Sequence, residues 1–253
     1  MTWRLVYASE VGTSHNNTGT PCQDSCWAQV DWLANGEPLL SVFVADGAGS
    51  AAKGGEGAEL AIEAAAAFIG KKVKQGEFGL SDGLATDLVV AVRDRIYAAA
   101  EAESLKARDF ACTFLGTLST AVGTLVLQIG DGGVVLDVGA GLEVAVVPMS
   151  GEYANMTHFV TDEDAVTVLQ TKTYSTRALR VAAFTDGIQR IALNLSSNTP
   201  HEPFFAPFFK GMAKATAEQE DQLQGLLVRF LSSAPVNERT DDDKTLALAL
   251  WMS

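Results

Sequence analysis

The sequence is poor in the residues on which several classes of enzyme depend. Its 253 residues include only three histidines and three cysteines: His15, His158, His201, Cys22, Cys26 and Cys112. A catalytic triad is poorly supported, because lone histidines are more often surface or structural residues than catalytic bases. An odd number of cysteines, in a chain whose first residues lack the apolar segment of a secretion signal, predicts a cytoplasmic protein with reduced thiols.

Positive charge and long apolar runs are also scarce. The chain has 18 lysines and arginines against 31 acidic residues, a formal net charge of −13. Such a surface repels phosphate backbones, so we expect no nucleic-acid partner. No apolar run is long enough to cross a bilayer, since even residues 134–147 are interrupted by Asp137 and Glu143. Without an obvious exposed apolar stripe, we expect a monomer with no membrane partner.

The sequence does contain well-separated blocks of strand-like and helix-like residues. We expect strands at residues 4–9, 25–33, 39–45, 117–128, 134–138, 143–147, 180–185 and 245–251, and helices at 58–72, 87–102, 204–217 and 218–232. Short turns at 131–133 and 139–141 contain glycine and indicate antiparallel pairing. Blocks of this kind predict the α+β class, with sheet packed on sheet and helices outside. No linker separates two halves, so we expect one domain over residues 1–253.

Three acidic motifs lie beside predicted strands. Asp46-Gly47 and Asp186-Gly187 each end an apolar run, and Asp242 stands shortly before the last one. An aspartate at the end of a buried strand is costly unless a cation or hydrogen bonds satisfy it. Three such aspartates indicate one shared site, and oxygen ligands suit Mg²⁺ or Mn²⁺ rather than zinc.

Residues 47–52 allow a second interpretation, because they match the dinucleotide-binding pattern Gly-x-Gly-x-x-Ala after a predicted strand. Two observations count against it. The pattern follows the third predicted strand rather than the first. The helix after it leads into another helix, so the expected second strand with an acidic end is missing. Cofactor binding is therefore the minority alternative.

In their order and spacing, the acidic motifs resemble those of the type 2C metal-dependent protein phosphatases, in a form similar to the bacterial branch. The family pattern runs from Gly-x-Arg and Glu-Asp through Asp-Gly-x-Gly, Gly-Ser-Thr-Ala, Gly-Asp-Ser-Arg and Ser-Asp-Gly to Asp-Asn-x-Thr. The matching segments here are 12–15, 23–24, 46–49, 118–121, 130–133, 185–187 and 242–245. Each motif alone is weak, but together they cover nearly the whole chain.

The resemblance implies a four-layer α-β-β-α sandwich, with two antiparallel sheets flanked by helices. It also implies a serine/threonine phosphatase that acts on phosphorylated proteins through two Mg²⁺ or Mn²⁺ ions, with a third as an option. Residues 150–176 correspond to the variable flap of the family, and their polar character suits a surface that faces the substrate.

The resemblance also assigns roles around the ions. Asp46 would bridge both ions, Asp186 and Asp242 would bind the second, and the Gly47 carbonyl would bind the first. Asp131 would join Asp186 at the weaker third site. Direct attack by metal-activated water would then make a covalent intermediate unnecessary.

Several positions depart from the family pattern. Asp24, which would orient a metal-bound water, follows Gln23 instead of glutamate. His15 stands where an arginine usually holds the substrate phosphate, and we expect it to contact that phosphate. Ala48 cannot donate a proton where some members have histidine, and Gly132-Gly133 replaces Ser-Arg. These departures leave open a catalytically silent relative that only senses phosphoproteins, although such a domain would not need the costly acidic cluster.

Overall fold

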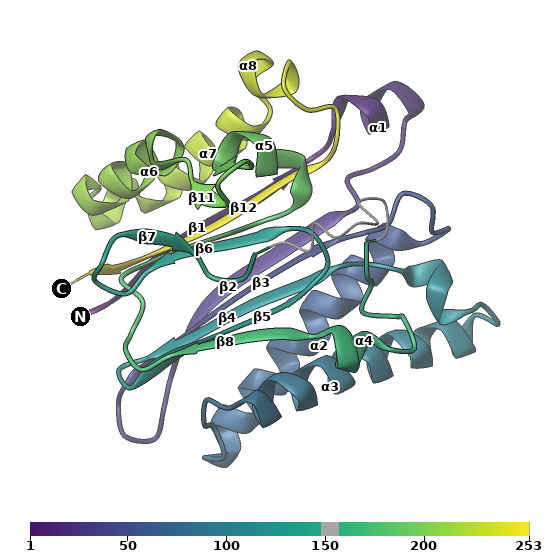
Figure 1. Ribbon diagram of the computed structural model, residues 1–253, viewed down its shortest axis with the longest axis horizontal. Helices are drawn as coiled ribbons and strands as arrows, with labels where there is room; N and C mark the ends of the chain where they lie inside the picture. Colours follow the sequence, from purple (N-terminus) through teal and green to yellow (C-terminus); the bar gives the residue numbers. More distant parts are fainter. Residues whose placement is uncertain (148–156, 253) are drawn as a thin grey trace.

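The computed structural model of the chain describes residues 1–147 and 157–252. Two five-stranded sheets with antiparallel neighbours pack face to face (Figure 1). Sheet I has the order β1 (Thr2–Glu10), β12 (Lys244–Met252), β9 (Arg180–Phe184), β6 (Gly133–Asp137), β7 (Leu142–Val144). Sheet II has the order β2 (Asp24–Trp32), β3 (Pro38–Asp46), β4 (Phe114–Thr120), β5 (Gly123–Ile129), β8 (Gln170–Tyr174).

Helices cover the outer face of each sheet (Figure 1). On sheet II lie α2 (Gly54–Gln75) and α3 (Asp82–Ala102), and on sheet I lie α5 (Gln189–Ala192), α6 (Glu202–Lys214) and α7 (Glu220–Leu231). The shorter elements are α1 (Thr13–Thr18), α4 (Ala165–Val168), α8 (Ala234–Asn237), β10 (Leu193–Asn194), β11 (Thr199–Pro200) and three 3₁₀ turns, Ala107–Phe110, Asp186–Ile188 and Ala217–Gln219.

The core consists of three apolar layers that follow from the two-residue period of the strands. In β3, Val42 and Val44 point between the sheets, whereas Leu39 and Phe43 point toward α2 and α3. The same alternation in β12 directs its leucines toward α6 and α7 and its alanines between the sheets. The predicted four-layer sandwich is therefore confirmed.

Two local predictions from sequence were wrong, and helix α1 was missed. Residues 117–128, predicted as one strand, form β4 and β5, joined at a two-residue turn between Thr120 and Gly123. Both strands are buried along their whole length, and the two turn residues, Ala121 and Val122, are apolar, so the hydrophobic pattern does not mark the turn. The segment 150–176, for which no helix or strand was predicted, contains α4 and the edge strand β8, and its residues 150–156 lie outside the described part. Helix α1 was not predicted, because none of its residues is buried.

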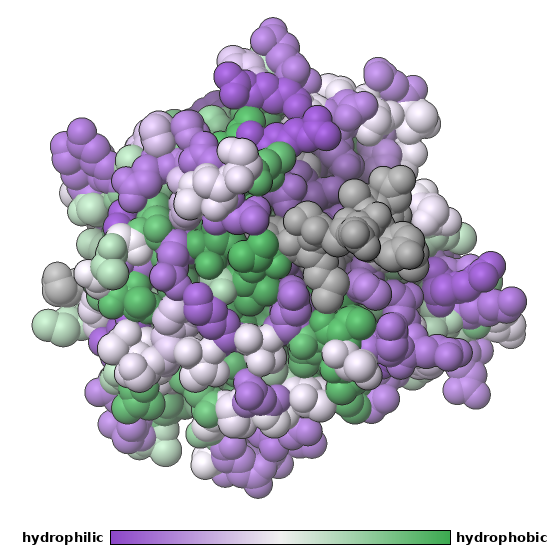
Figure 2. Space-filling model, in the orientation of Figure 1, coloured by the Kyte–Doolittle hydropathy of each residue, from purple (hydrophilic) through white to green (hydrophobic). Residues whose placement is uncertain are grey.

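The surface is mixed in polarity, and the two kinds of side chain are distributed unevenly over the visible face. In the orientation of Figure 1, hydrophilic side chains spread around the rim of the visible face (Figure 2). Hydrophobic side chains reach the surface mainly toward the middle of this face, over the edges of the two sheets (Figure 2). Within the described ranges, no helix is long and apolar enough to cross a membrane.

Candidate metal centre and active site

The three predicted aspartates meet at one end of the sandwich. Asp46 is the last residue of β3, Asp186 begins the turn after β9, and Asp242 lies just before β12. Because β9 and β12 are antiparallel neighbours, the end of one and the start of the other share an edge, and β3 of sheet II ends opposite them. Together with Asp131, these carboxylates line one cleft of about 250 Å³.

Glycine follows two of these aspartates because backbones approach closely there. A Cβ atom on Gly47 would lie 2.3 Å from the carbonyl carbon of Gly54, at the start of α2. A Cβ atom on Gly187 would lie 1.8 Å from the carbonyl oxygen of Asp243. The Asp-Gly pairs are therefore not simple turn signals: Gly47 lets the end of β3 touch the start of α2, and Gly187 lets the turn after β9 touch the segment before β12.

Within the described residues, Asp46, Asp131, Asp186 and Asp242 have no ion-pair partner in the cleft. Burial, followed by the charges of Asp24, Asp186 and Asp242, raises the pKa of Asp46 far above its ordinary value. Burial and the charges of Asp131 and Asp242 raise the pKa of Asp186 to about 6. Among the described residues, no lysine or arginine forms an ion pair with any of these cleft aspartates. The cleft thus offers the oxygen donors and the unmet negative charge that fit a hard divalent cation.

Asp131 joins the cleft from the turn between β5 and β6. Its Oδ2 accepts a hydrogen bond of 2.6 Å from the Thr157 hydroxyl, and its carbonyl oxygen accepts one of 2.7 Å from Gln189 Nε2. Thr157 and Phe159, which follow the undescribed part of the predicted flap, also line the cleft. Sequence reasoning placed this segment at the substrate surface without naming either residue.

Asp24 lies behind the cleft rather than in it. It is 8% exposed and stands directly opposite Asp46 in the ladder between β2 and β3. Its Oδ2 accepts hydrogen bonds of 2.8 Å from the hydroxyls of Thr185 and Thr245. Burial raises the pKa of Asp24 to about 7, although these two hydroxyls oppose the rise. Neither threonine was predicted as a site residue from sequence.

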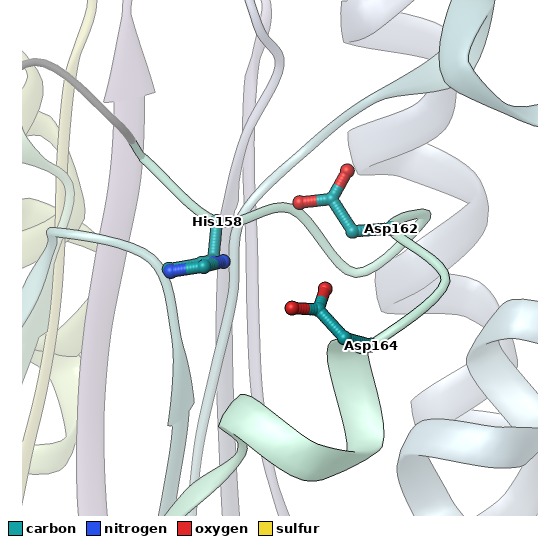
Figure 3. Close-up of side chains that lie close together, drawn as sticks. All are labelled: His158, Asp162 and Asp164. Carbon is teal, nitrogen blue, oxygen red and sulfur yellow. The ribbon is translucent and has the colours of Figure 1, made fainter.

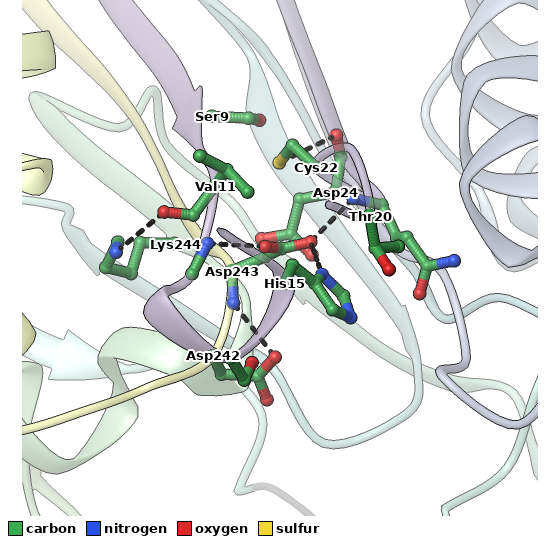
Figure 4. Close-up of polar contacts among 12 residues, drawn as sticks. Ser9, Val11, His15, Thr20, Cys22, Asp24, Asp242, Asp243 and Lys244 are labelled. Atoms are coloured by element: carbon green, nitrogen blue, oxygen red, sulfur yellow. Dashed lines mark hydrogen bonds and ion pairs between the residues drawn. The ribbon is translucent and has the colours of Figure 1, made fainter. Parts of the chain in front are cut away.

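His15 reaches the cleft from α1 and is held by Asp243, a residue that sequence reasoning missed. Asp243 Oδ2 lies 2.9 Å from His15 Nδ1 and accepts a 2.6 Å hydrogen bond from the Gln23 N–H. Its Oδ1 accepts a 2.6 Å hydrogen bond from the Gly12 N–H (Figure 4). The contact could have been predicted from two linked differences from the family pattern. His15 replaces the arginine of the first motif, and Asp243 replaces the asparagine of the last one.

A second group of possible ligands lies in the turn before α4. His158, Asp162 and Asp164 point toward one another (Figure 3), and their nearest ligand atoms all lie within 4.8 Å of each other. Asp162 Oδ2 already accepts a 2.8 Å hydrogen bond from the Phe159 N–H, which is the ordinary role of an aspartate in a turn. We assign no ion to this group.

The structure excludes two other interpretations of the sequence. β3 is antiparallel to both of its neighbours, and α2 leads into α3, so residues 47–52 do not belong to a dinucleotide-binding βαβ unit. Residues 79–83 match the Gly-x-Ser-x-Gly pattern of hydrolase nucleophiles, which sequence reasoning overlooked. However, Ser81 is the N-cap of α3 and accepts a hydrogen bond from the Leu84 N–H.

Comparisons with known proteins agree with this geometry. The family model described as protein phosphatase 2C matches residues 11–231. Serine/threonine-protein phosphatase 3 of Escherichia coli (strain K12) is 64% identical over 251 residues, which cover 99% of this chain and 99% of that protein.

Solved structures resemble the fold. The catalytic domain of the serine/threonine protein phosphatase PstP, in complex with two manganese ions, has a TM-score of 0.62 and 20% identity, covering 98% of this chain and 99% of that one. Serine/threonine phosphatase Stp1 from Staphylococcus aureus has a TM-score of 0.61 and 12% identity, covering 100% and 96%. At these identities the likeness concerns the fold alone.

Proposed function

We propose that this chain, which belongs to the protein phosphatase 2C family, hydrolyses phosphoserine and phosphothreonine in proteins with the help of Mg²⁺ or Mn²⁺. One observation carries the proposal. Asp46, Asp131, Asp186 and Asp242 line a single cleft, and among the described residues no lysine or arginine neutralises them. The name of the 64% identical relative supports the serine/threonine class of substrate.

The residues present fit a centre of two ions. Asp46 lines the cleft and would be shared by both ions, with Asp186 and Asp242 on the second ion and the Gly47 carbonyl on the first. Asp131 would complete a third, weaker ion position together with Asp186. The two carboxylates are close enough for the charge of Asp131 to raise the pKa of Asp186. When bound, such ions make water nucleophilic near neutral pH and neutralise charge on the phosphoryl oxygens. The two manganese ions of the PstP structure support this number.

The chain itself positions these ligands. Asp24 ties the start of β2 to sheet I through the hydroxyls of Thr185 and Thr245, and so fixes the end of β3, where Asp46 stands, beside Asp186. The proposed role of Asp24 in orienting water would fall to Oδ1, because Oδ2 is already occupied by two hydroxyl donors.

We further infer one domain over residues 1–253, acting as a cytoplasmic monomer on phosphorylated proteins. The antiparallel pairing of β1 with β12, from Thr2 opposite Met252 to Glu10 opposite Lys244, joins both ends of the chain in sheet I. This arrangement supports a single folding unit.

The test is phosphate release from a phosphoserine peptide and from p-nitrophenyl phosphate, with Mn²⁺ and with excess chelator. We expect turnover of both substrates with Mn²⁺ and none with chelator. Asp137→Asn, an aspartate substitution outside the cleft, serves as the matched control and should retain turnover. A folded protein that binds Mn²⁺ but releases no phosphate from either substrate would instead support the silent, phosphoprotein-sensing alternative.

A further inference from the structure

The side of the cleft formed by α1 contains a polar pair that the metal ligands do not explain. Asp243 is 3% exposed, and three donors surround its two oxygens, the N–H groups of Gly12 and Gln23 and the Nδ1 atom of His15. A carboxylate held by three donors has little freedom to move. Since one of its oxygens contacts Nδ1, the carboxylate in turn fixes the orientation of the His15 ring.

This contact determines which ring nitrogen is available to a ligand. Nδ1 of His15 is occupied by Asp243, whereas Nε2 is turned away from it (Figure 4). The His15 side chain is 21% exposed and lines the same cleft as Asp46, Asp186 and Asp242. The free nitrogen is therefore the one that a molecule bound in the cleft can meet.

His15 is also distinctive among the residues of the cleft. The other described lining residues are carboxylates, hydroxyls, an amide, glycines, an alanine and a phenylalanine, and none of them is a lysine, arginine, tyrosine or cysteine. The residue after Asp46-Gly47 is Ala48, which has no proton to donate. Histidine is the side chain suited to proton transfer near neutral pH. Among the described residues that line the cleft, only His15 combines this chemistry with an oriented and accessible nitrogen.

We propose that His15 is the general acid of the reaction and that Asp243 is its positioning residue, an inference that rests on the proposed phosphatase function. A water oxygen bonds to phosphorus and gives one proton to solvent, while the bond between phosphorus and the seryl or threonyl oxygen breaks. The imidazolium form of His15 donates its Nε2 proton to that departing oxygen, and the neutral ring, which keeps its Nδ1 proton, regains a proton from solvent. In sum, one water is consumed for each phosphoester.

This role differs from the phosphate contact predicted from sequence. The two roles can be distinguished by comparing two substrates whose leaving groups differ in basicity. A seryl alkoxide is strongly basic and leaves with difficulty without a proton, whereas p-nitrophenolate is a stable anion and needs none. For His15→Gln we expect kcat for a phosphoserine peptide to fall by about 100-fold or more, the usual contribution of a positioned acid. For p-nitrophenyl phosphate we expect a change of less than about fivefold.

Two further variants control for side effects of the substitution. His201→Gln removes a histidine at the N-terminus of α6, outside the cleft, and should leave the ratio of the two rates unchanged. His15→Ala leaves space at the site, so added imidazole should restore part of the phosphopeptide turnover and have little effect on p-nitrophenyl phosphate.

Asp243 needs a readout that does not depend on turnover. In metal-free protein labelled with ¹⁵N-histidine, the neutral His15 ring should carry its proton on Nδ1, and Asp243→Asn should shift the population toward Nε2–H. His15→Gln assigns the signal. Combined with His15→Gln, Asp243→Asn should cause little additional loss of phosphopeptide turnover, because both residues act on one proton.

The outcomes are separable from those of the proposed function. If the wild-type protein hydrolyses neither substrate, the phosphatase proposal itself fails. If it hydrolyses both, and His15→Gln lowers both rates equally or raises only KM, His15 holds the phosphate and the general-acid inference is overturned. The absence of imidazole rescue in a folded His15→Ala protein would also count against it.

Discussion

Aspartates lie at both ends of the antiparallel pair of strands β6 and β9, and the two ends differ. At one end Asp137 lies opposite Arg180 in the ladder and accepts hydrogen bonds of 3.0 and 2.7 Å from its guanidinium. At the other end Asp131 precedes β6 and Asp186 follows β9, and within the described residues neither has a cationic partner.

The pKa values follow this difference. Burial alone would raise the pKa of Asp137, but hydrogen bonds from Arg180 and from the N–H groups of Gly139 and Gly141 bring it below its ordinary value. Burial and the Asp131 carboxylate raise the pKa of Asp186 to about 6. The same pair of strands can thus supply an arginine to a carboxylate. No arginine is among the described residues that line the cleft, which favours a site whose cation comes from solution.

Asp46→Asn should separate the two ends most clearly. Because Asp46 is the carboxylate proposed to be shared by both ions, its replacement should lower phosphopeptide turnover by more than about 100-fold. This loss exceeds the usual effect of replacing a residue that only supports a metal ligand. Asp131→Asn should cost less, and folding should survive both changes because each relieves repulsion. Initial rates at saturating Mn²⁺ and urea unfolding measure these effects. Wild-type turnover in Asp46→Asn would remove the metal assignment.

Metal binding should stabilise the folded protein by an amount that depends on Asp46, at the cleft end, and not on Asp137, at the other end. For a ligand that binds the folded state alone, Mn²⁺ at 100 times its Kd adds about 2.7 kcal/mol to the free energy of unfolding. We expect a gain of this order in the wild type and in Asp137→Asn, and a much smaller gain in Asp46→Asn. Urea unfolding with and without Mn²⁺ measures it, and equal gains in all three proteins would place the ion elsewhere.

Asp137→Asn should have the opposite profile, with a loss of stability and no loss of turnover. It removes the carboxylate charge and leaves the Arg180 guanidinium without its partner, at a cost of about 1–3 kcal/mol. Urea unfolding and kcat/KM, measured on the same preparation, test both halves of the statement. A variant that unfolds normally but has lost activity would mean that this end also takes part in the reaction.

The sequence predicted the cleft better than the contacts within it. Asp46, Asp186 and Asp242 could be found because each stands beside a buried apolar strand, and strand ends are readable from hydrophobic patterns. The contact of His15 with Asp243 joins residues 228 positions apart, and it exists only because α1 packs against the start of β12. Likewise, the turn between β4 and β5 could not be found from hydrophobicity, because its two exposed residues, Ala121 and Val122, are as apolar as the buried strands around them.

The smallest expected effect is on the pH dependence of stability in chelator. The pKa values of Asp186 and Asp24 in the folded protein, about 6 and about 7, lie above the ordinary value near 4. The folded state therefore binds more protons than the unfolded state between about pH 4 and 7, and stability falls as pH rises through this range.

Asp137 acts with the opposite sign in a different window. Its pKa is lowered in the folded state, so the stability that it contributes is lost only as the pH falls below about 4. Between pH 5 and 7.5 the raised carboxylates should thus dominate, and stability should decrease as the pH rises. Urea unfolding across this range in chelator should show the decrease, and Asp186→Asn should reduce its slope whereas Asp137→Asn should not. A flat profile in the wild-type protein would mean that the cleft carboxylates are already neutralised without a metal, and the contrast between the two ends of β6 and β9 would disappear.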